Sequence, residues 1–141
     1  YYKHGEDEPQ YTQVLFLFTN GYQLAYFSMR KLGELDVIGS VTDFIDEKDL
    51  GPDALEITLA DFKQAVKGRR MMAKSLLMDQ ETLAGIGNVY SDEILFQVGI
   101  HPRTKINVLD TSELEKLFHT MKDVLQTAIE HQAARTNSRK T

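Results

Sequence analysis

Residues 76–102 read LLMDQETLAGIGNVYSDEILFQVGIHP, and this stretch decides the fold of the second half of the chain. Gly85 and Gly87 lie two residues apart, directly before an amphipathic run that predicts a helix over residues 89–98. Glycine adopts backbone conformations that are closed to other residues, and it has no side chain to block close approach. Because the first N–H groups of a helix carry the positive end of its dipole, this turn predicts an anion site, with phosphate as the usual occupant.

Two polar side chains near the glycines fit the same anion. Asn88 is placed either to cap the helix or to reach the anion with its amide, and Lys74 offers a full positive charge from a preceding helix predicted over residues 71–78. The competing interpretation is a tight turn followed by an N-cap, since single glycine motifs are weak signals. A dinucleotide-binding fingerprint is excluded, because the preceding segment reads as helical and no third glycine follows in step.

The net charge of −5 is unevenly distributed along the chain. Residues 1–51 hold four basic and nine acidic side chains, whereas residues 52–141 hold twelve of each. Residues 62–78 carry basic side chains and no acidic one, namely Lys63, Lys67, Arg69, Arg70 and Lys74. Because local fields decide where a polyanion binds, this basic cluster fits a nucleic-acid partner. A solvated helix face is the alternative.

The first third of the chain predicts antiparallel strands. Residues 11–28 form two β-rich runs around Asn20-Gly21, the strongest short hairpin signal, because a type I′ turn needs positive φ at both central residues. A third strand is expected at residues 35–38. Residues 1–10 are expected to form a loop, and residues 39–52 a connector.

The later residues predict helices. Thr58 and Asp61 form a capping-box-like pattern before a helix with apolar residues at helical spacing. Asp110 and Glu113 form the same pattern before a long helix with an apolar stripe. Strands first and helices afterwards predict the α+β class. The chain contains no cysteine, which excludes disulfides, cysteine-based zinc sites and thiol nucleophiles. No apolar run approaches the ~20 residues that span a bilayer, so no membrane partner is expected.

The stretch from residue 74 to residue 102 closely resembles one protein family. Its segments KSLLMD (74–79), AGIGNVY (84–90), DEIL (92–95) and GIHP (99–102) are similar, without a gap, to the helix–two-turn–helix module of the formamidopyrimidine-DNA glycosylases. The resemblance implies that residues 1–50 are the C-terminal part of an antiparallel β-sandwich domain. It implies that residues 51–141 are the helical, DNA-binding domain.

The resemblance also implies a function in the repair of oxidised purines. Members of the family flip the damaged nucleotide out of the duplex, excise the base and nick the abasic site. In the family, the turn between the two helices grips the phosphates beside the lesion, a role that falls on Gly87 and Asn88, with Gly85 in the same turn. A lysine at the position of Lys74 reaches into the lesion site. Double-stranded DNA with an oxidised base or an abasic site is the implied partner.

A second similarity lies in the strand half. The segment SMRKLG, residues 28–33, stands where the family has a loop that fills the gap left by the flipped base. Arg30 matches the arginine that addresses the orphaned partner base. Leu32 stands at the wedge position, which requires apolar volume and not a particular ring.

Two hallmarks of the family do not occur in these 141 residues. The family's chemistry uses an N-terminal Pro-Glu pair, whereas this sequence starts Tyr1-Tyr2, and the family's zinc ribbon needs cysteines. We therefore expect an internal piece of a glycosylase that has no catalytic residue and no cofactor in this chain, with zinc possible only in the parent enzyme. A bacterial, cytoplasmic, DNA-associated location is expected.

Two alternatives to a glycosylase piece remain open at this point. One is a free-standing, non-catalytic DNA-binding module related to the glycosylases. The other is a ribosomal or topoisomerase-like use of a similar helical module. The strands carry one further expectation: a hairpin without an opposing sheet exposes an apolar face and an open edge, which predicts self-association of the chain.

Overall fold

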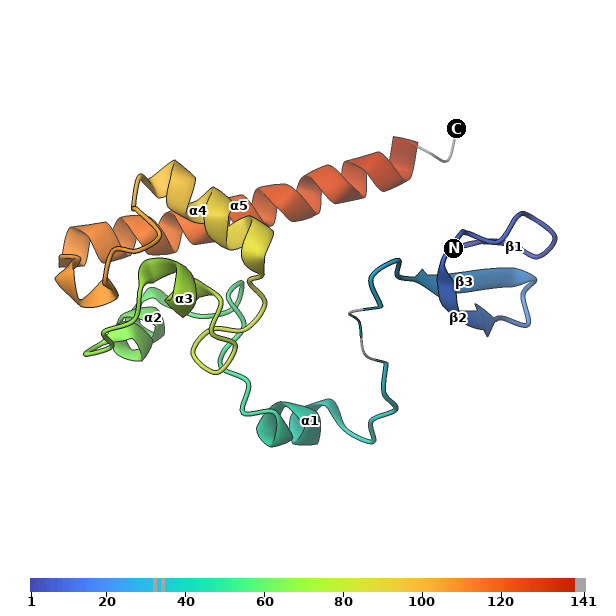
Figure 1. The fold of residues 1–141 in the computed structure, drawn as a ribbon, viewed down its shortest axis with the longest axis horizontal. Helices are drawn as coiled ribbons and strands as arrows, with labels where there is room; N and C mark the ends of the chain where they lie inside the picture. The colour runs from blue at the N-terminus through green and yellow to red at the C-terminus, as the bar shows by residue number, and fades with distance from the viewer. Residues whose placement is uncertain (32, 34, 139–141) are drawn as a thin grey trace. The chain divides into compact units, whose positions relative to one another are not determined.

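The computed structural model of the protein describes residues 1–31, 33 and 35–138, with side chains described as far as residue 131. The chain divides into two compact units, residues 1–39 and 40–141 (Figure 1). A small antiparallel sheet forms the first unit and helices form the second, which confirms the α+β class. The domain boundary expected after residue 50 stays a prediction.

The first unit is a three-stranded antiparallel sheet in the order β1-β3-β2. Its strands are β1 (Tyr2–Lys3), β2 (Thr12–Leu17) and β3 (Tyr22–Phe27). The hairpin of β2 and β3 confirms the prediction for residues 11–28, with Leu15 opposite Ala25. The third strand was predicted in the wrong place, because residues 35–38 form no strand. Residues 2–3 take this position by pairing with β3.

The turn of the hairpin differs from the expected type I′ geometry. Gly21 has a φ of 80°, but Asn20 is not among the residues with positive φ. The N–H of Gly21 donates to the carbonyl oxygen of Phe18, and the N–H of Phe18 donates to that of Tyr22. This pattern is a three-residue loop that ends in a left-handed glycine. The Asn20 side chain instead accepts a hydrogen bond from the N–H of Tyr22 at 3.1 Å.

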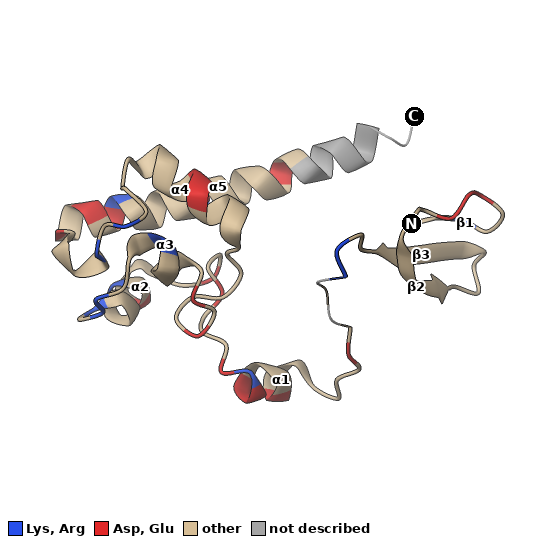
Figure 2. Cartoon of the chain, viewed as in Figure 1, with Lys and Arg blue, Asp and Glu red and all other residues tan. Residues whose placement is uncertain are grey.

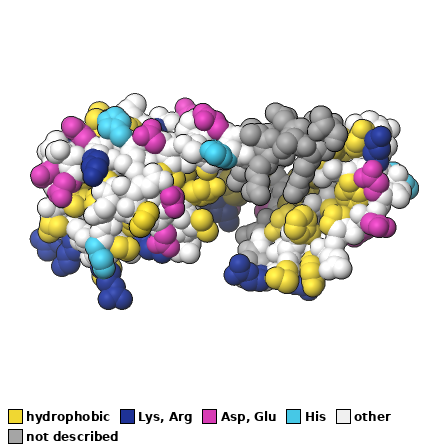
Figure 3. Space-filling view, turned by 90° about the horizontal axis from the view of Figure 1, so that it is seen from above, with side chains coloured by type: hydrophobic (Ala, Val, Ile, Leu, Met, Phe, Trp, Pro, Cys, Tyr) yellow, Lys and Arg dark blue, Asp and Glu magenta, His cyan; other side chains and the backbone are white. Residues whose placement is uncertain are grey.

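The sheet unit has little core of its own. Among the described residues 1–31, Gln23 is the one buried residue. Phe16, Leu17 and Phe18 are all exposed, with Leu17 at 68%. Figure 3 shows apolar side chains on the visible face of this unit, at the right of the view. The strand edge of β2 that faces away from β3 has no partner strand in the described sheet.

A short helix, α1 (Val41–Glu47), lies in the segment that was expected to be a plain connector. Ser40 is its N-cap, and the Ser40 hydroxyl accepts a hydrogen bond from the N–H of Asp43 at 3.3 Å. No residue of α1 is buried. Local capping therefore forms this helix without help from a core, and the prediction for residues 39–52 was wrong at this point.

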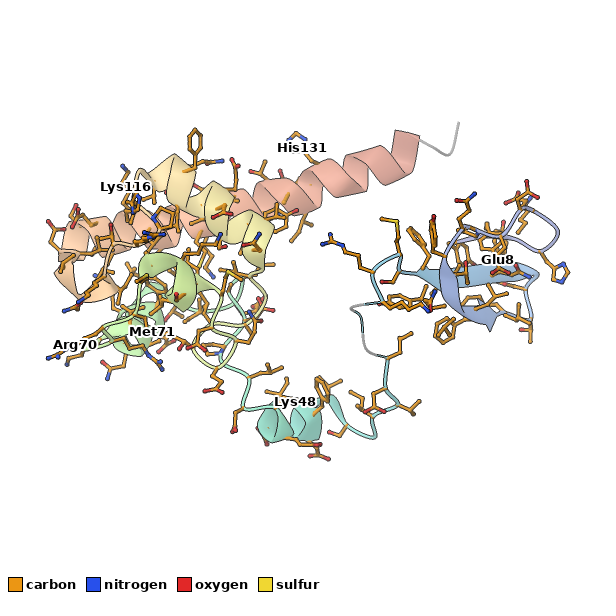
Figure 4. The ribbon with its side chains drawn as sticks, viewed as in Figure 1. Glu8, Lys48, Arg70, Met71, Lys116 and His131 are labelled. Atoms are coloured by element: carbon orange, nitrogen blue, oxygen red, sulfur yellow. The ribbon has the colours of Figure 1, made fainter. Side chains whose placement is uncertain are left out.

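The other helices pack together in the second unit. They are α2 (Leu59–Val66), α3 (Ala73–Leu77), α4 (Asn88–Val98), the 3-10 helix η1 (Ile106–Val108) and α5 (Thr111–Ser138). Helix α4 lies along α5, and α2 and α3 lie beside them (Figure 1). Lys116, labelled in Figure 4, reaches from α5 to the last turn of α4, where its ammonium donates to the carbonyl oxygen of Val98 at 3.1 Å.

Both predicted capping boxes are confirmed. The Thr58 hydroxyl accepts from the N–H of Asp61 at 3.2 Å and donates to the Asp61 carboxylate at 2.7 Å. The Asp110 carboxylate accepts from the N–H of Glu113 at 2.8 Å, and the Glu113 carboxylate accepts from the N–H of Asp110 at 2.9 Å. The Asp110 box satisfies two N–H groups at the start of α5. The Thr58 side chain satisfies one at the start of α2, because the Asp61 carboxylate bonds to the Thr58 hydroxyl and not to its N–H.

The hydrophobic core lies entirely in the second unit. It joins the segment before α2, the inner faces of α2, α3 and α4, and the first half of α5. The apolar stripe expected along α5 is buried as far as Leu125, whereas Ile129 is 48% exposed. The buried apolar residues are Ala54, Ile57, Phe62, Val66, Ala73, Leu76, Leu77, Leu83, Ile86, Ile94, Leu95, Val98, Ile106, Leu117, Phe118, Met121, Val124 and Leu125.

Candidate functional site

The turn at residues 85–88 is built differently at its two glycines. Gly85 has a φ of 99°, a left-handed conformation that side chains disfavour. Gly87 has an ordinary extended backbone, with φ −105° and ψ −173°. A Cβ atom added at Gly87 would meet nothing within 4 Å. Gly85 therefore shapes the turn, whereas Gly87 leaves open space in front of α4.

The side chain of Gln80 holds this turn in place. Its amide oxygen accepts from the N–H of Gly85 at 3.0 Å, and its amide nitrogen donates to the carbonyl oxygen of Ile86 at 2.9 Å. Gln80 was not among the site residues predicted from the sequence. No spacing rule could have found it, because its partners lie beyond a bend in the chain that local periodicity does not predict.

The segment before α2 supports the same turn from the other side. The N–H of Ala84 donates to the carbonyl oxygen of Pro52 at 3.0 Å, and the N–H of Ala54 donates to that of Ala84 at 2.9 Å. Gly51 lies so close to the turn at residues 80–82 that an added Cβ would stand 2.6 Å from the carbonyl oxygen of Glu81. A glycine is thus needed at Gly51 for close backbone approach.

Helix α4 begins at this turn with its N-terminal N–H groups available. Gly87 is the N-cap, so the alternative in which Asn88 caps the helix was wrong, and Asn88 is the first helical residue with an exposed side chain. The first intrahelical bond runs from the N–H of Ser91 to the carbonyl oxygen of Gly87 at 3.0 Å. The N–H groups before Ser91 have no intrahelical acceptor. No acidic residue stands in the first turn. This end of α4 has the properties of an anion site.

Lys74 is held in an ion pair. Its ammonium contacts both carboxylate oxygens of Asp92, at 2.6 and 2.8 Å. The pair joins α3 to α4, and the side chains are 29% and 52% exposed, respectively. The Lys74 charge predicted for the anion site is therefore balanced by a carboxylate in this structure.

The rest of the basic cluster is partly neutralised as well. Lys63 pairs with Glu115 at 2.5 Å, and Arg69 lies 3.6 Å from a carboxylate oxygen of Asp79. Among the described residues, Lys67 and Arg70 have no ion pair. Figure 2 shows the basic residues around α2, the loop after it and α3, and Figure 4 labels Arg70 in that loop.

Tyr90 in α4 and His101, which follows this helix, make contacts within the protein. Tyr90 is half-buried and packs against the hydrophobic core. Beside it, a hollow of about 210 Å³ is lined by Asp53, Ala54, Leu55, Gly85, Tyr90, Leu125, Ala128 and Ile129. His101 follows the end of α4, and its Nδ1 atom accepts from the N–H of Arg103 at 3.2 Å. This contact agrees with a role in closing the helix.

The other two site residues predicted from the sequence belong to the strand half of the chain. Arg30 is an exposed residue of the sheet unit, just after β3. Leu32 lies outside the described residues. Both assignments stay predictions. Within the described part of the chain, no three His, Asp or Glu side chains gather as metal ligands would. None of its helices has the length and hydrophobicity to cross a membrane.

The fold and the turn define a helical domain in which two helices, α3 and α4, are joined through a glycine-containing turn. Residues 50–140 match the family model described as the formamidopyrimidine-DNA glycosylase H2TH domain. The chain therefore belongs to the formamidopyrimidine-DNA glycosylase family, as the sequence motifs indicated.

Curated relatives agree with this assignment. The chain is 37% identical over 133 residues to a formamidopyrimidine-DNA glycosylase of Bacillus subtilis, a match that covers 90% of this chain and 48% of the relative. It is 36% identical over 129 residues to the one of Herpetosiphon aurantiacus, covering 89% and 47%. The chain thus spans about half the length of these relatives.

Solved structures show the same fold. A complex between the Lactococcus lactis enzyme and DNA with an abasic site has a TM-score of 0.81 at 27% identity, covering 92% of this chain and 49% of that one. A complex of MutM with DNA that contains carbocyclic 8-oxo-G has a TM-score of 0.80 at 27% identity, covering 92% and 50%.

Proposed function

We propose that this protein is the DNA-binding portion of a base-excision-repair glycosylase and abasic-site lyase that acts on oxidised purines. The observation that carries the proposal is the N-terminus of α4. Gly87 leaves it open, its first N–H groups lack intrahelical acceptors, and Asn88 stands beside them with an exposed amide. A backbone phosphate of DNA is the anion that this arrangement fits.

The partner in this proposal is double-stranded DNA with an oxidised base or an abasic site. The family assignment supports this choice, and so do the solved relatives, which hold DNA with an abasic site or an 8-oxo-G analogue. Gly87 and Asn88 bind the phosphate beside the lesion, and Gly85 gives the turn its shape. Lys74 contributes a cationic contact. The relatives from Bacillus subtilis and Herpetosiphon aurantiacus are bacterial, which supports a DNA-associated location in the bacterial cytoplasm.

The strand half adds two roles to the proposal, and both rest on the resemblance of residues 28–33 to the family's wedge loop. Arg30 addresses the base opposite the flipped nucleotide, and Leu32 fills the gap in the stack. Arg30→Ala tests the first role. It should weaken binding to a duplex with an abasic-site analogue more than binding to an undamaged duplex, because only the former offers an orphaned base.

Asn88→Asp tests the phosphate site. The variant places a negative charge beside the phosphate, and we expect affinity for a duplex with a tetrahydrofuran abasic-site analogue to fall by about 1–2 kcal/mol, roughly 5- to 30-fold. Fluorescence anisotropy titrations measure the change. Asn107→Asp is the matched control, since it makes the same substitution at an exposed position of η1. Equal effects of both variants would refute the site and leave only a general charge effect.

We also propose that the sheet unit recruits a second copy of the chain. The edge of β2 is open, and this strand carries no charged residue. Phe16 and Leu17 in the strand are exposed, as is Phe18 directly after it. Light scattering coupled to size exclusion should give a dimer or larger species. Leu17→Lys should shift it toward monomer, because charge on an edge strand opposes pairing. Thr19→Lys in the hairpin loop adds the same charge and should not. A monomeric wild-type chain would refute the proposal.

A further inference from the structure

We propose that Asp92 restrains Lys74 and thereby limits the affinity of the α4 site for DNA phosphates. This inference rests on the proposed function and deepens it. The Lys74 ammonium donates hydrogen bonds to both carboxylate oxygens of Asp92, at 2.6 and 2.8 Å. A carboxylate and a phosphate are both anions that accept hydrogen bonds from an ammonium, so they compete for the same donor.

Asp92 lies close to the N-terminus of α4, where the phosphate is proposed to bind. Asp92 follows Asn88 by four residues on α4, and residues four apart on a helix are neighbours on one face, with Cβ atoms about 5–6 Å apart. The Lys74 ammonium therefore contacts α4 at a residue one helical turn beyond Asn88. The two groups form a row that a DNA backbone can contact at successive phosphates.

The exposure of the pair makes exchange of partners feasible. The Asp92 side chain is 52% exposed and that of Lys74 is 29% exposed, so water and salt screen the attraction between them. A phosphate that arrives at the turn meets an ammonium which has to leave its carboxylate. The like charge of Asp92 remains beside the incoming phosphate. Both effects oppose binding, and both disappear when Asp92 loses its charge.

Neighbouring charges supply an internal comparison. Glu93 is the next residue on α4, and its carboxylate accepts a hydrogen bond from the Gln97 side chain at 2.7 Å and does not touch Lys74. Removing the charge of Glu93 changes the net charge of the chain by the same amount. Only the loss of the Asp92 charge releases the lysine.

The experiment measures how duplex affinity depends on salt for the 141-residue chain. The variants are Asp92→Asn, Glu93→Gln, Lys74→Ala and the double variant Lys74→Ala/Asp92→Asn. The probe is a labelled duplex with a tetrahydrofuran abasic-site analogue. We expect Asp92→Asn to bind more tightly and to steepen the slope of log K against log salt by about 0.9, the value for one more neutralised phosphate. When the salt concentration falls tenfold, the affinity of Asp92→Asn should therefore rise about 8-fold more than that of the wild-type chain.

The controls decide between release of Lys74 and a general charge effect. Glu93→Gln should leave the slope unchanged, and the double variant should show no steepening relative to Lys74→Ala. An unchanged or shallower slope for Asp92→Asn would overturn the inference, as would equal gains from Glu93→Gln or in the Lys74→Ala background. If the proposed function itself is wrong, the result differs: Asn88→Asp then binds the duplex with the same affinity as the wild-type chain. Absence of duplex binding by both the wild-type chain and Asp92→Asn would overturn both.

Discussion

Alanine substitutions at the two glycines of the turn should have different effects. Gly85→Ala should lower the stability of the protein, whereas Gly87→Ala should lower its affinity for DNA. Gly85→Ala forces a side chain into a backbone with φ of 99°, although an added Cβ meets nothing closer than a carboxylate oxygen of Asp53 at 3.9 Å. The cost is therefore conformational, about 1–2 kcal/mol of unfolding free energy. For a unit of roughly one hundred residues, each kcal/mol lowers the melting temperature by about 4–8 °C.

Gly87→Ala should behave in the opposite way. Its backbone is extended and an added Cβ meets nothing within 4 Å. Alanine is a poorer N-cap than glycine, but it also lowers the entropy of the unfolded chain, so the net change should stay within about 0.5 kcal/mol. The new methyl group stands where the phosphate approaches the N–H groups of α4. Loss of that contact should weaken duplex binding roughly 5- to 30-fold, equivalent to about 1–2 kcal/mol.

Thermal unfolding followed by circular dichroism gives the stability of both variants, and anisotropy with the abasic-analogue duplex gives their affinity. We expect a lowered melting temperature for Gly85→Ala and a nearly unchanged one for Gly87→Ala, with a clear loss of affinity in the latter. The reasoning is refuted if Gly87→Ala destabilises the protein as much as Gly85→Ala does. It is also refuted if Gly87→Ala binds the duplex as well as the wild-type chain does.

Substitutions at three further positions test contacts within the helical unit. Gly51→Ala should destabilise the helical unit, since its Cβ would stand 2.6 Å from the carbonyl oxygen of Glu81; an unchanged midpoint in urea would contradict this close approach. Gln80→Leu should cost about 1–3 kcal/mol, because the N–H of Gly85 loses its acceptor, and amide hydrogen exchange at that group should accelerate. Asp110→Ala should cost about 1 kcal/mol through loss of the α5 cap, measured by urea unfolding, whereas Asp110→Asn should retain most of the stability.

Features whose hydrogen bonds join residues near in sequence were predictable from the sequence. The capping boxes at Thr58 and Asp110 span four residues each, and the hairpin around Gly21 is closed within five. Such contacts depend on local backbone geometry, which residue type largely determines. The family motif of residues 74–102 was readable for the same reason, since it is one continuous stretch. The apolar period of α5 likewise predicted which side of this helix is buried as far as Leu125.

Even local signals failed where two structures compete for the same residues. Asn20-Gly21 favours a type I′ turn, but the side chain of Asn20 bonds to the N–H of Tyr22 in a longer loop. Asn88 is a good N-cap residue, but the preceding glycine takes that position. Residues 35–38 have strand-like composition without a partner strand, and a strand requires one to satisfy its backbone groups.

The tertiary structure alone decided the contacts that join distant segments. Lys74 and Asp92 are 18 residues apart, and the sequence assigned the lysine to the anion without its carboxylate partner. The hydrogen bonds of Gln80 to the turn and the close approach of Gly51 to residue 81 depend on how the chain folds back. The sequence thus determined the capped helix starts at Thr58 and Asp110, the hairpin, the glycine turn and the family. Packing determined the electrostatics of the site, because charge neutralisation depends on distances in space that spacing along the chain does not specify.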